Sequence, residues 1–187
     1  MNLFIDACVR NDSRTRKLAD AVLSNLGGEI QTLRLQEVLF PVSDESFLQK
    51  RDGLIAEGRF DDPLFQMAHQ FSNAENIVIA APYWDLSFPS SLKQYIEQIN
   101  VLGITFRYTA DGRPEGLCRA EALYYVMTSG GTFCPDEFGY GYIEALAKNF
   151  YGIPKTRLIS ATGLDIFGAD LDSLLQEAIE SVKEKMR

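Results

Sequence analysis

The chain has 187 residues, of which 46% are hydrophobic, enough for one substantial core, so we expect a single domain over residues 1–187. Its formal net charge of −8 argues against nucleic acid and anionic membranes as partners, because binding to either needs a basic surface. No apolar run approaches the roughly 20 residues that a membrane-spanning helix needs.

The cysteines indicate the compartment. Cys8, Cys118 and Cys134 fit neither a disulfide framework nor a zinc-site spacing. The first residues have a strand pattern, with no basic segment leading into a long apolar run, so no export signal is expected. We therefore expect a reduced, cytoplasmic protein.

The first third of the chain predicts two strands and two helices. Asn2–Ala7 reads as a short strand, and Asp12–Ser13 offers an N-cap for a helix with one apolar face. A second strand follows over Glu29–Leu35. The connector Gln36–Asp61 is long, and its apolar residues follow no clean period. We therefore expect it to cover another part of the protein or to carry a short helix. Asp62–Pro63 begins the next helix.

The stretch from Asn76 to Lys93 is the centre of the predicted fold. Ile77–Ala81 is a continuous apolar run, which is typical of a strand covered by helices on both faces. The run ends at Pro82, and Pro89–Ser91 begins a helix. The aromatic residues between them therefore lie at the carboxyl end of a central strand, where open α/β sheets bind ligands.

The remaining elements continue the alternation. Within residues 103–112, Thr105–Thr109 alternates like a strand and Asp111–Gly112 is a strong turn signal, which predicts a hairpin. The later elements are a strand over Ala122–Thr128, a helix over Glu137–Tyr151, a strand over Arg157–Thr162 and a helix capped by Asp170. Five strands alternating with helices predict a doubly wound parallel sheet of flavodoxin-like order 2-1-3-4-5, with helices on both faces. In this order the carboxyl ends of strands one, three and four share one crevice.

The loop after the first strand has the composition of an anion site. Two guanidinium groups, of Arg10 and Arg14, and two hydroxyls, of Ser13 and Thr15, meet at the amino end of a helix. The unpaired N–H groups and dipole of such an end favour a phosphate, and arginine can bind it bidentately. Taken alone, the loop also fits an ordinary helix cap with solvated charges.

Two further loops complete the predicted site. Tyr83 and Trp84 supply aromatic side chains, although alone they fit a turn packed on the core equally well. The glycines of Ser129–Thr132 let backbone N–H groups approach a flat ligand, although alone they also fit a flexible turn. Together, a phosphate cradle, an aromatic wall and backbone donors predict a site for a phosphorylated planar cofactor.

One long segment carries a family likeness. The run APYWDLSFPSSLKQYIEQINVLGITFRYTADGRPEGL, followed by TSGG, resembles the FMN-dependent NAD(P)H:quinone oxidoreductases and azoreductases. The likeness is close from the central strand to Gly131 and looser in the phosphate loop. It implies FMN as cofactor, NAD(P)H as co-substrate, a small aromatic electron acceptor such as a quinone or azo compound, and a homodimer.

The resemblance also implies residue roles. Around the FMN phosphate it places Arg10, Ser13, Arg14 and Thr15. Along the isoalloxazine it places Pro82, Tyr83, Trp84, Asp85 and Leu86. At the pyrimidine edge it places Ser129, Gly130, Gly131 and Thr132. Near the flavin or the partner subunit, as substrate-binding residues, it places Phe106 and Tyr108. The chain departs from many azoreductases in having Asp85 instead of asparagine and no arginine within the Ser-Gly-Gly loop.

Two other functional classes remain open. Cys8, five intervening residues and Arg14 match the Cys-x5-Arg signature of phosphotyrosine phosphatases, with Cys8 as nucleophile, although the loop lacks glycine. A flavodoxin-type electron carrier fits the acidic net charge. However, the chain lacks the Thr/Ser-x-Thr-Gly-x-Thr phosphate loop of flavodoxins. His69, the only histidine, lies off the apolar face of its helix, so we expect a solvated surface residue.

Overall fold

The computed structural model describes residues 1–187 and has one five-stranded parallel sheet in the order β2-β1-β3-β6-β7. The strands are β1 (Asn2–Asp6), β2 (Ile30–Arg34), β3 (Asn76–Ala80), β6 (Ala122–Thr128) and β7 (Lys155–Ala161). In strand order within the sheet this is 2-1-3-4-5, so the predicted flavodoxin-like fold is confirmed.

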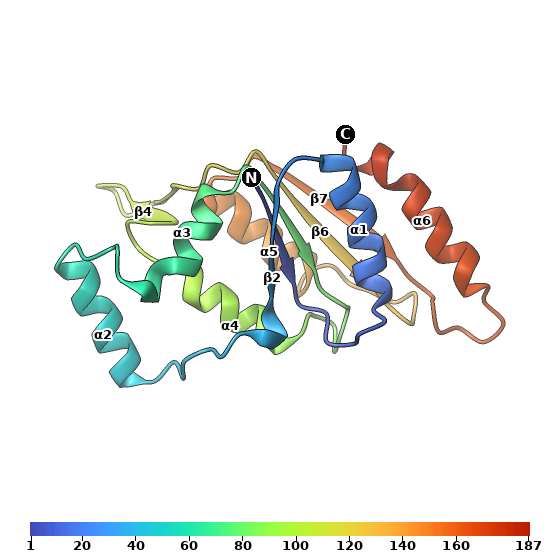
Figure 1. Cartoon of the computed structure of the whole chain (residues 1–187), viewed down its shortest axis with the longest axis horizontal. Coiled ribbons are helices and arrows are strands. Elements are labelled where there is room, and N and C mark those ends of the chain that lie inside the picture. The colour runs from blue at the N-terminus through green and yellow to red at the C-terminus, as the bar shows by residue number, and fades with distance from the viewer.

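Helices cover both faces of the sheet (Figure 1). One face carries α1 (Arg14–Leu26) and α6 (Leu171–Lys185), and the other carries α3 (Gln66–Asn73), α4 (Ser90–Ile99) and α5 (Tyr140–Leu146). Successive side chains of a strand point to opposite faces, so Ile77 and Ile79 join one hydrophobic cluster while Val78 and Ala80 join the other. The apolar run of β3 is therefore buried on both sides, as predicted.

The predicted helix caps are present. Ser13 accepts a hydrogen bond from the N–H of Arg16 at the start of α1, and Asp170 accepts one from the N–H of Ser173 at the start of α6. Asp62 caps the short η2 helix (Pro63–Phe65) that leads into α3. The predicted helix over Glu137–Tyr151 begins later, and its last residues, Ala147–Tyr151, form the π-helical turn η3.

The long connector after β2 does carry its own structure. It contains the η1 turn (Leu35–Glu37) and α2 (Glu45–Ala56), which stands apart from the sheet in Figure 1. Only Phe47 and Leu54 of α2 are buried. No helix of the protein has both the length and the apolar character that crossing a membrane requires.

The predicted hairpin is also present, at the opposite end of the sheet from the strands' carboxyl ends. Its antiparallel strands are β4 (Phe106–Tyr108) and β5 (Pro114–Gly116). Gly116 lies against Tyr151 and Gly152, just before β7 begins. His69 is half-buried, and its Nε2 atom lies 2.7 Å from the carbonyl oxygen of Phe60, so the expectation of a solvated histidine was wrong.

The contact at Gly116 gives a stability prediction. A Cβ atom there would lie 2.1 Å from the backbone of both Tyr151 and Gly152, so Gly116→Ala should lower the free energy of unfolding by at least about 3 kcal/mol. As a control, Gly53→Ala has open space inside α2 and should raise it by about 0.5–1 kcal/mol. Urea titration checks both values, and a wild-type midpoint for Gly116→Ala would contradict the packing.

Candidate functional site

Loops after four of the parallel strands border one pocket at the carboxyl edge of the sheet. The pocket encloses about 640 Å³, including open solvent at its mouth. It is lined by nine of the thirteen residues predicted to bind the cofactor: Arg10, Ser13, Arg14, Thr15, Pro82, Tyr83, Trp84, Ser129 and Gly130. The structure thus brings together the three predicted loops, which are far apart in sequence.

The other four predicted residues lie beside this pocket. Asp85 lines a neighbouring pocket that shares Val9 and Trp84 with the first. Leu86, Gly131 and Thr132 line neither. Sequence reasoning missed four lining residues, which are Val9, Asp12, Thr128 and Asp165.

Phe106 and Tyr108 do not border the pocket of their own chain. The Phe106 ring is buried and packs edge-on against Phe150, with centroids 4.9 Å apart, and against Tyr108. The hairpin lies at the amino end of the strands, so of the two predicted positions, near the flavin or near the partner subunit, this place in the chain favours the second. A contact of the exposed Tyr108 with a partner subunit stays a prediction.

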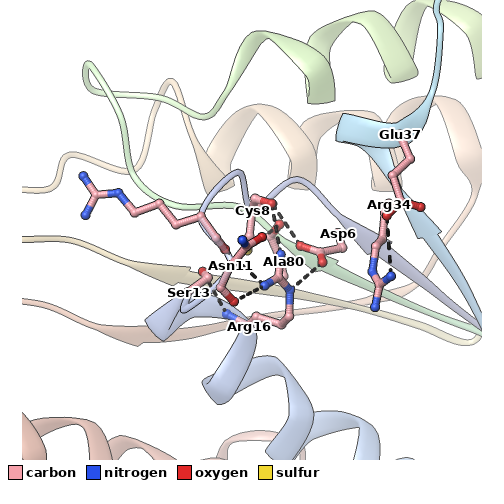
Figure 2. Close-up of polar contacts among 9 residues, drawn as sticks. Asp6, Cys8, Asn11, Ser13, Arg16, Arg34, Glu37 and Ala80 are labelled. Carbon is pink, nitrogen blue, oxygen red and sulfur yellow. Dashed lines mark hydrogen bonds and ion pairs between the residues drawn. The ribbon is translucent and has the colours of Figure 1, made fainter.

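The loop between β1 and α1, residues 7–13, is held by a buried ion pair (Figure 2). Asp6 is 1% exposed and accepts hydrogen bonds from the Cys8 N–H at 2.9 Å and the Arg16 Nε at 2.7 Å. Arg16 also donates to the carbonyl oxygens of Cys8, Arg10 and Asn11 at 2.9–3.1 Å. The hydrogen bond to Asp6 raises the pKa of Arg16, so the guanidinium stays charged. The only feature of the sequence that pointed to this ion pair was an acidic residue at the end of an apolar strand.

Two hydroxyls differ in what they can bind. The Thr15 hydroxyl is buried and lies 2.7 Å from the Thr128 hydroxyl, which joins the start of α1 to the end of β6. The Ser13 side chain is only half-buried and borders the pocket. Ser13 is therefore the hydroxyl better placed for a ligand, and Thr15 fixes the helix.

A second ion pair closes the other side of the pocket. Arg14 donates to Asp165 at 2.8 Å and to the Leu164 carbonyl at 3.3 Å. The hydrogen bond from Arg14 lowers the pKa of Asp165 below its usual range. Both hydrogen bonds use only Nη1 of Arg14, so its Nε and Nη2 N–H groups remain for the predicted contact with a phosphate.

The Ser-Gly-Gly loop lies against the loop after β7. The Ser129 and Gly130 carbonyls accept from the N–H groups of Leu164 and Asp165 at 3.1 and 3.0 Å. A Cβ atom on Gly130 would lie 2.3 Å from the Asp165 carboxylate, so a larger residue here would displace the Asp165 side chain. The Gly130 and Gly131 N–H groups donate no hydrogen bond within the chain, so they are available to a ligand.

A tight turn positions the aromatic wall, which consists of Tyr83 and Trp84. Trp84 and Ser87 exchange two backbone hydrogen bonds, at 3.1 and 2.7 Å, around Asp85 and Leu86. Both central residues have positive φ, +51° and +66°, which is uncommon outside glycine. Behind the turn, the Tyr83 N–H donates to the Thr128 carbonyl and its hydroxyl to the Pro135 carbonyl. Trp84 is left 41% exposed at the pocket.

Cys8 does not line the pocket. Its side chain is buried, and its Sγ lies 3.7 Å from the Ala80 carbonyl oxygen. Burial raises the pKa of the Cys8 thiol to about 12, so the thiol stays protonated at neutral pH. A phosphatase needs a thiolate at this position, and the structure gives that function no support.

The donor set fits FMN. Free backbone N–H groups and Ser13 at a helix start suit a phosphate, and the exposed Trp84 with the Gly130 and Gly131 N–H groups suits a flat ring with polar edges. No group of three or more His, Cys, Asp and Glu side chains could hold a metal ion.

Comparisons with known proteins agree with this chemistry. The flavodoxin-like fold family matches residues 2–186. The chain is 34% identical to an FMN-dependent NADH:quinone oxidoreductase of Clostridium perfringens, over 95% of this chain and 93% of that protein. It is 36% identical to the enzyme of that name from Clostridium beijerinckii, over 92% and 89%.

Solved structures show the same fold. A Bacillus anthracis azoreductase superposes with a TM-score of 0.83 at 21% identity, covering 98% of this chain and 96% of that one. An FMN-dependent NADH-azoreductase from Bacillus anthracis, solved in complex with FMN, gives a TM-score of 0.77 at 25% identity, covering 98% and 95%.

The burial of Cys8 predicts its reactivity. At pH 8, iodoacetamide should modify the half-buried Cys134 of the folded protein well before Cys8, whose raised pKa and burial both suppress attack. Mass spectrometry of the peptides measures this, with urea-unfolded protein as the control in which all three cysteines react. Faster labelling of Cys8 than of Cys134 would show an activated thiolate.

Proposed function

This chain belongs to the flavodoxin-like fold family and to its FMN-dependent NADH:quinone oxidoreductases, and on that basis we propose that it transfers two electrons from NAD(P)H to a quinone, azo or related aromatic acceptor. The observation that supports this most is the pocket, where an anion-binding loop, an aromatic wall and free backbone donors meet. The names of the relatives favour NADH over NADPH as the donor.

FMN is the proposed cofactor, and when bound it would accept a hydride from NADH and pass two electrons to the acceptor. The chain's own residues bind and orient it. The Ser13 hydroxyl and the loop N–H groups hold the phosphate, and Trp84 supports the ring. The Gly130 and Gly131 N–H groups favour negative charge at the ring edge.

The pocket next to Trp84 offers space for the substrates. It is lined by Asp85 and the start of α4, and it shares Trp84 and Val9 with the cofactor pocket. Donor and acceptor would occupy this space in turn, which gives ping-pong kinetics. The carboxylate of Asp85 near the ring would disfavour a reduced, anionic cofactor, so it should lower the reduction potential.

Turnover tests this function. Protein loaded with FMN should oxidise NADH in the presence of a quinone. Trp84→Ala removes part of the aromatic surface and should lower kcat/KM about tenfold, since an aromatic contact contributes about 1–1.5 kcal/mol. Cys8→Ser should keep wild-type turnover. Failure to oxidise either NADH or NADPH with a panel of quinones would contradict the proposed reaction.

We also propose that the protein is a cytoplasmic homodimer in which the Gln36–Asp61 connector or the hairpin completes the partner's site. The support is apolar surface that one chain leaves uncovered. On the connector, Leu39, Val42 and Leu48 are 98%, 77% and 41% exposed. On the hairpin, Tyr108 is 54% exposed. Such surface in a small domain marks an interface.

Light scattering tests the dimer. At micromolar concentration the wild-type protein should have twice the mass of one chain. The double substitution Leu39→Asp and Val42→Asp adds charge to exposed positions without touching the core, so it should give a folded monomer. A wild-type monomer would contradict the proposed assembly.

A further inference from the structure

Four consecutive carbonyl groups of the β1–α1 loop accept hydrogen bonds from side chains outside that loop. The four residues are Cys8, Val9, Arg10 and Asn11. Arg16, in α1, bonds three of these carbonyls. Gln36, in η1, has its amide nitrogen 3.0 Å from the Val9 oxygen and 3.3 Å from the Cys8 oxygen when the amide is oriented to satisfy its donors.

This pattern fixes where the loop's N–H groups point. All peptide bonds are trans, so each N–H points opposite to the carbonyl of the preceding residue. The N–H groups of residues 9–12 therefore point away from Arg16 and Gln36, and none of them donates a hydrogen bond within the chain. Val9, Arg10 and Asp12 line the cofactor pocket. Successive free N–H groups of this kind form an anion-binding concavity.

Arg16 itself is not placed to bind the anion. Its hydrogen bonds to Asp6, Cys8, Arg10 and Asn11 use four of its five N–H groups, so no two-pronged donor remains. Its charge is paired with the buried Asp6 carboxylate. Gln36 is neutral. What both side chains contribute is the shape of the loop.

We infer that Arg16 and Gln36 are positioning residues that hold the β1–α1 loop in its phosphate-binding conformation before the cofactor arrives. The inference rests on the proposed function, because the phosphate is that of FMN. Preorganisation removes the cost of ordering the loop on binding. Without it, FMN affinity should fall by about tenfold to a hundredfold, the cost of ordering one or two backbone residues.

Titration of apoprotein with FMN and with riboflavin, which lacks the phosphate, isolates this role. The wild-type protein should prefer FMN, and equal binding would contradict the FMN phosphate site before any variant is compared. Arg16→Lys keeps the charge but cannot reach Asp6 and three carbonyls together. It should lose FMN affinity at least about tenfold while riboflavin affinity changes less than about twofold.

Gln36→Met and Arg34→Met complete the test. Gln36 is an exposed, uncharged residue, so its substitution should leave the fold intact and still reduce the preference for FMN. If Arg16→Lys does not fold, the measurement on Gln36→Met decides the outcome. Arg34 pairs with Glu37 outside the Arg16 cluster (Figure 2), so Arg34→Met should bind both flavins like the wild type. A wild-type ratio of the two affinities in folded Arg16→Lys or in Gln36→Met would overturn the inference, as would an equal loss for both flavins.

Discussion

A buried carboxylate at the end of a central strand must have a partner, and the pairing of Asp6 with Arg16 meets this need. Asp6 is almost fully buried, and leaving one member of such a pair unpaired typically costs about 3–5 kcal/mol. Because Arg16 sits in the first turns of α1, the same contact fixes how the chain passes from β1 into that helix. The carbonyls of the loop then face Arg16, and the N–H groups that follow them point away from Arg16.

Thr128 extends this constraint to the rest of the site. Its hydroxyl contacts that of Thr15 at the start of α1, and its carbonyl accepts from the Tyr83 N–H at the start of the aromatic wall. The end of β6 therefore sets the distance between the anion-binding loop and the wall. The parallel sheet brings the carboxyl ends of its strands to one edge, and these contacts turn the shared edge into a pocket of defined shape.

Most of the fold could be predicted from local sequence patterns. The apolar run of β3 identified a strand buried on both faces, and Ser13 and Asp170 identified the starts of two helices. Such signals involve residues within a few positions of each other. Three of the four loops that form the pocket were predictable for the same reason, because each follows a recognisable strand.

Contacts between distant residues were not predictable in this way. Asp165 meets Arg14 across 151 positions of sequence, and no local pattern selects that carboxylate among its neighbours. The role of Arg16 depends on loop carbonyl directions that composition does not encode. The hairpin was recognised from its turn, but its place at the far end of the sheet depends on the close contact of Gly116 with Gly152.

A crystal structure of the protein with bound FMN would test most directly where the phosphate binds. We expect the phosphate within hydrogen-bond distance of the loop N–H groups of residues 9–12 and the Ser13 hydroxyl, with the ring against Trp84. The Arg16 contacts to Asp6 and the loop carbonyls should be unchanged from those described above. A phosphate bound elsewhere, or a loop whose carbonyls have left Arg16, would contradict a site that is built before its cofactor binds.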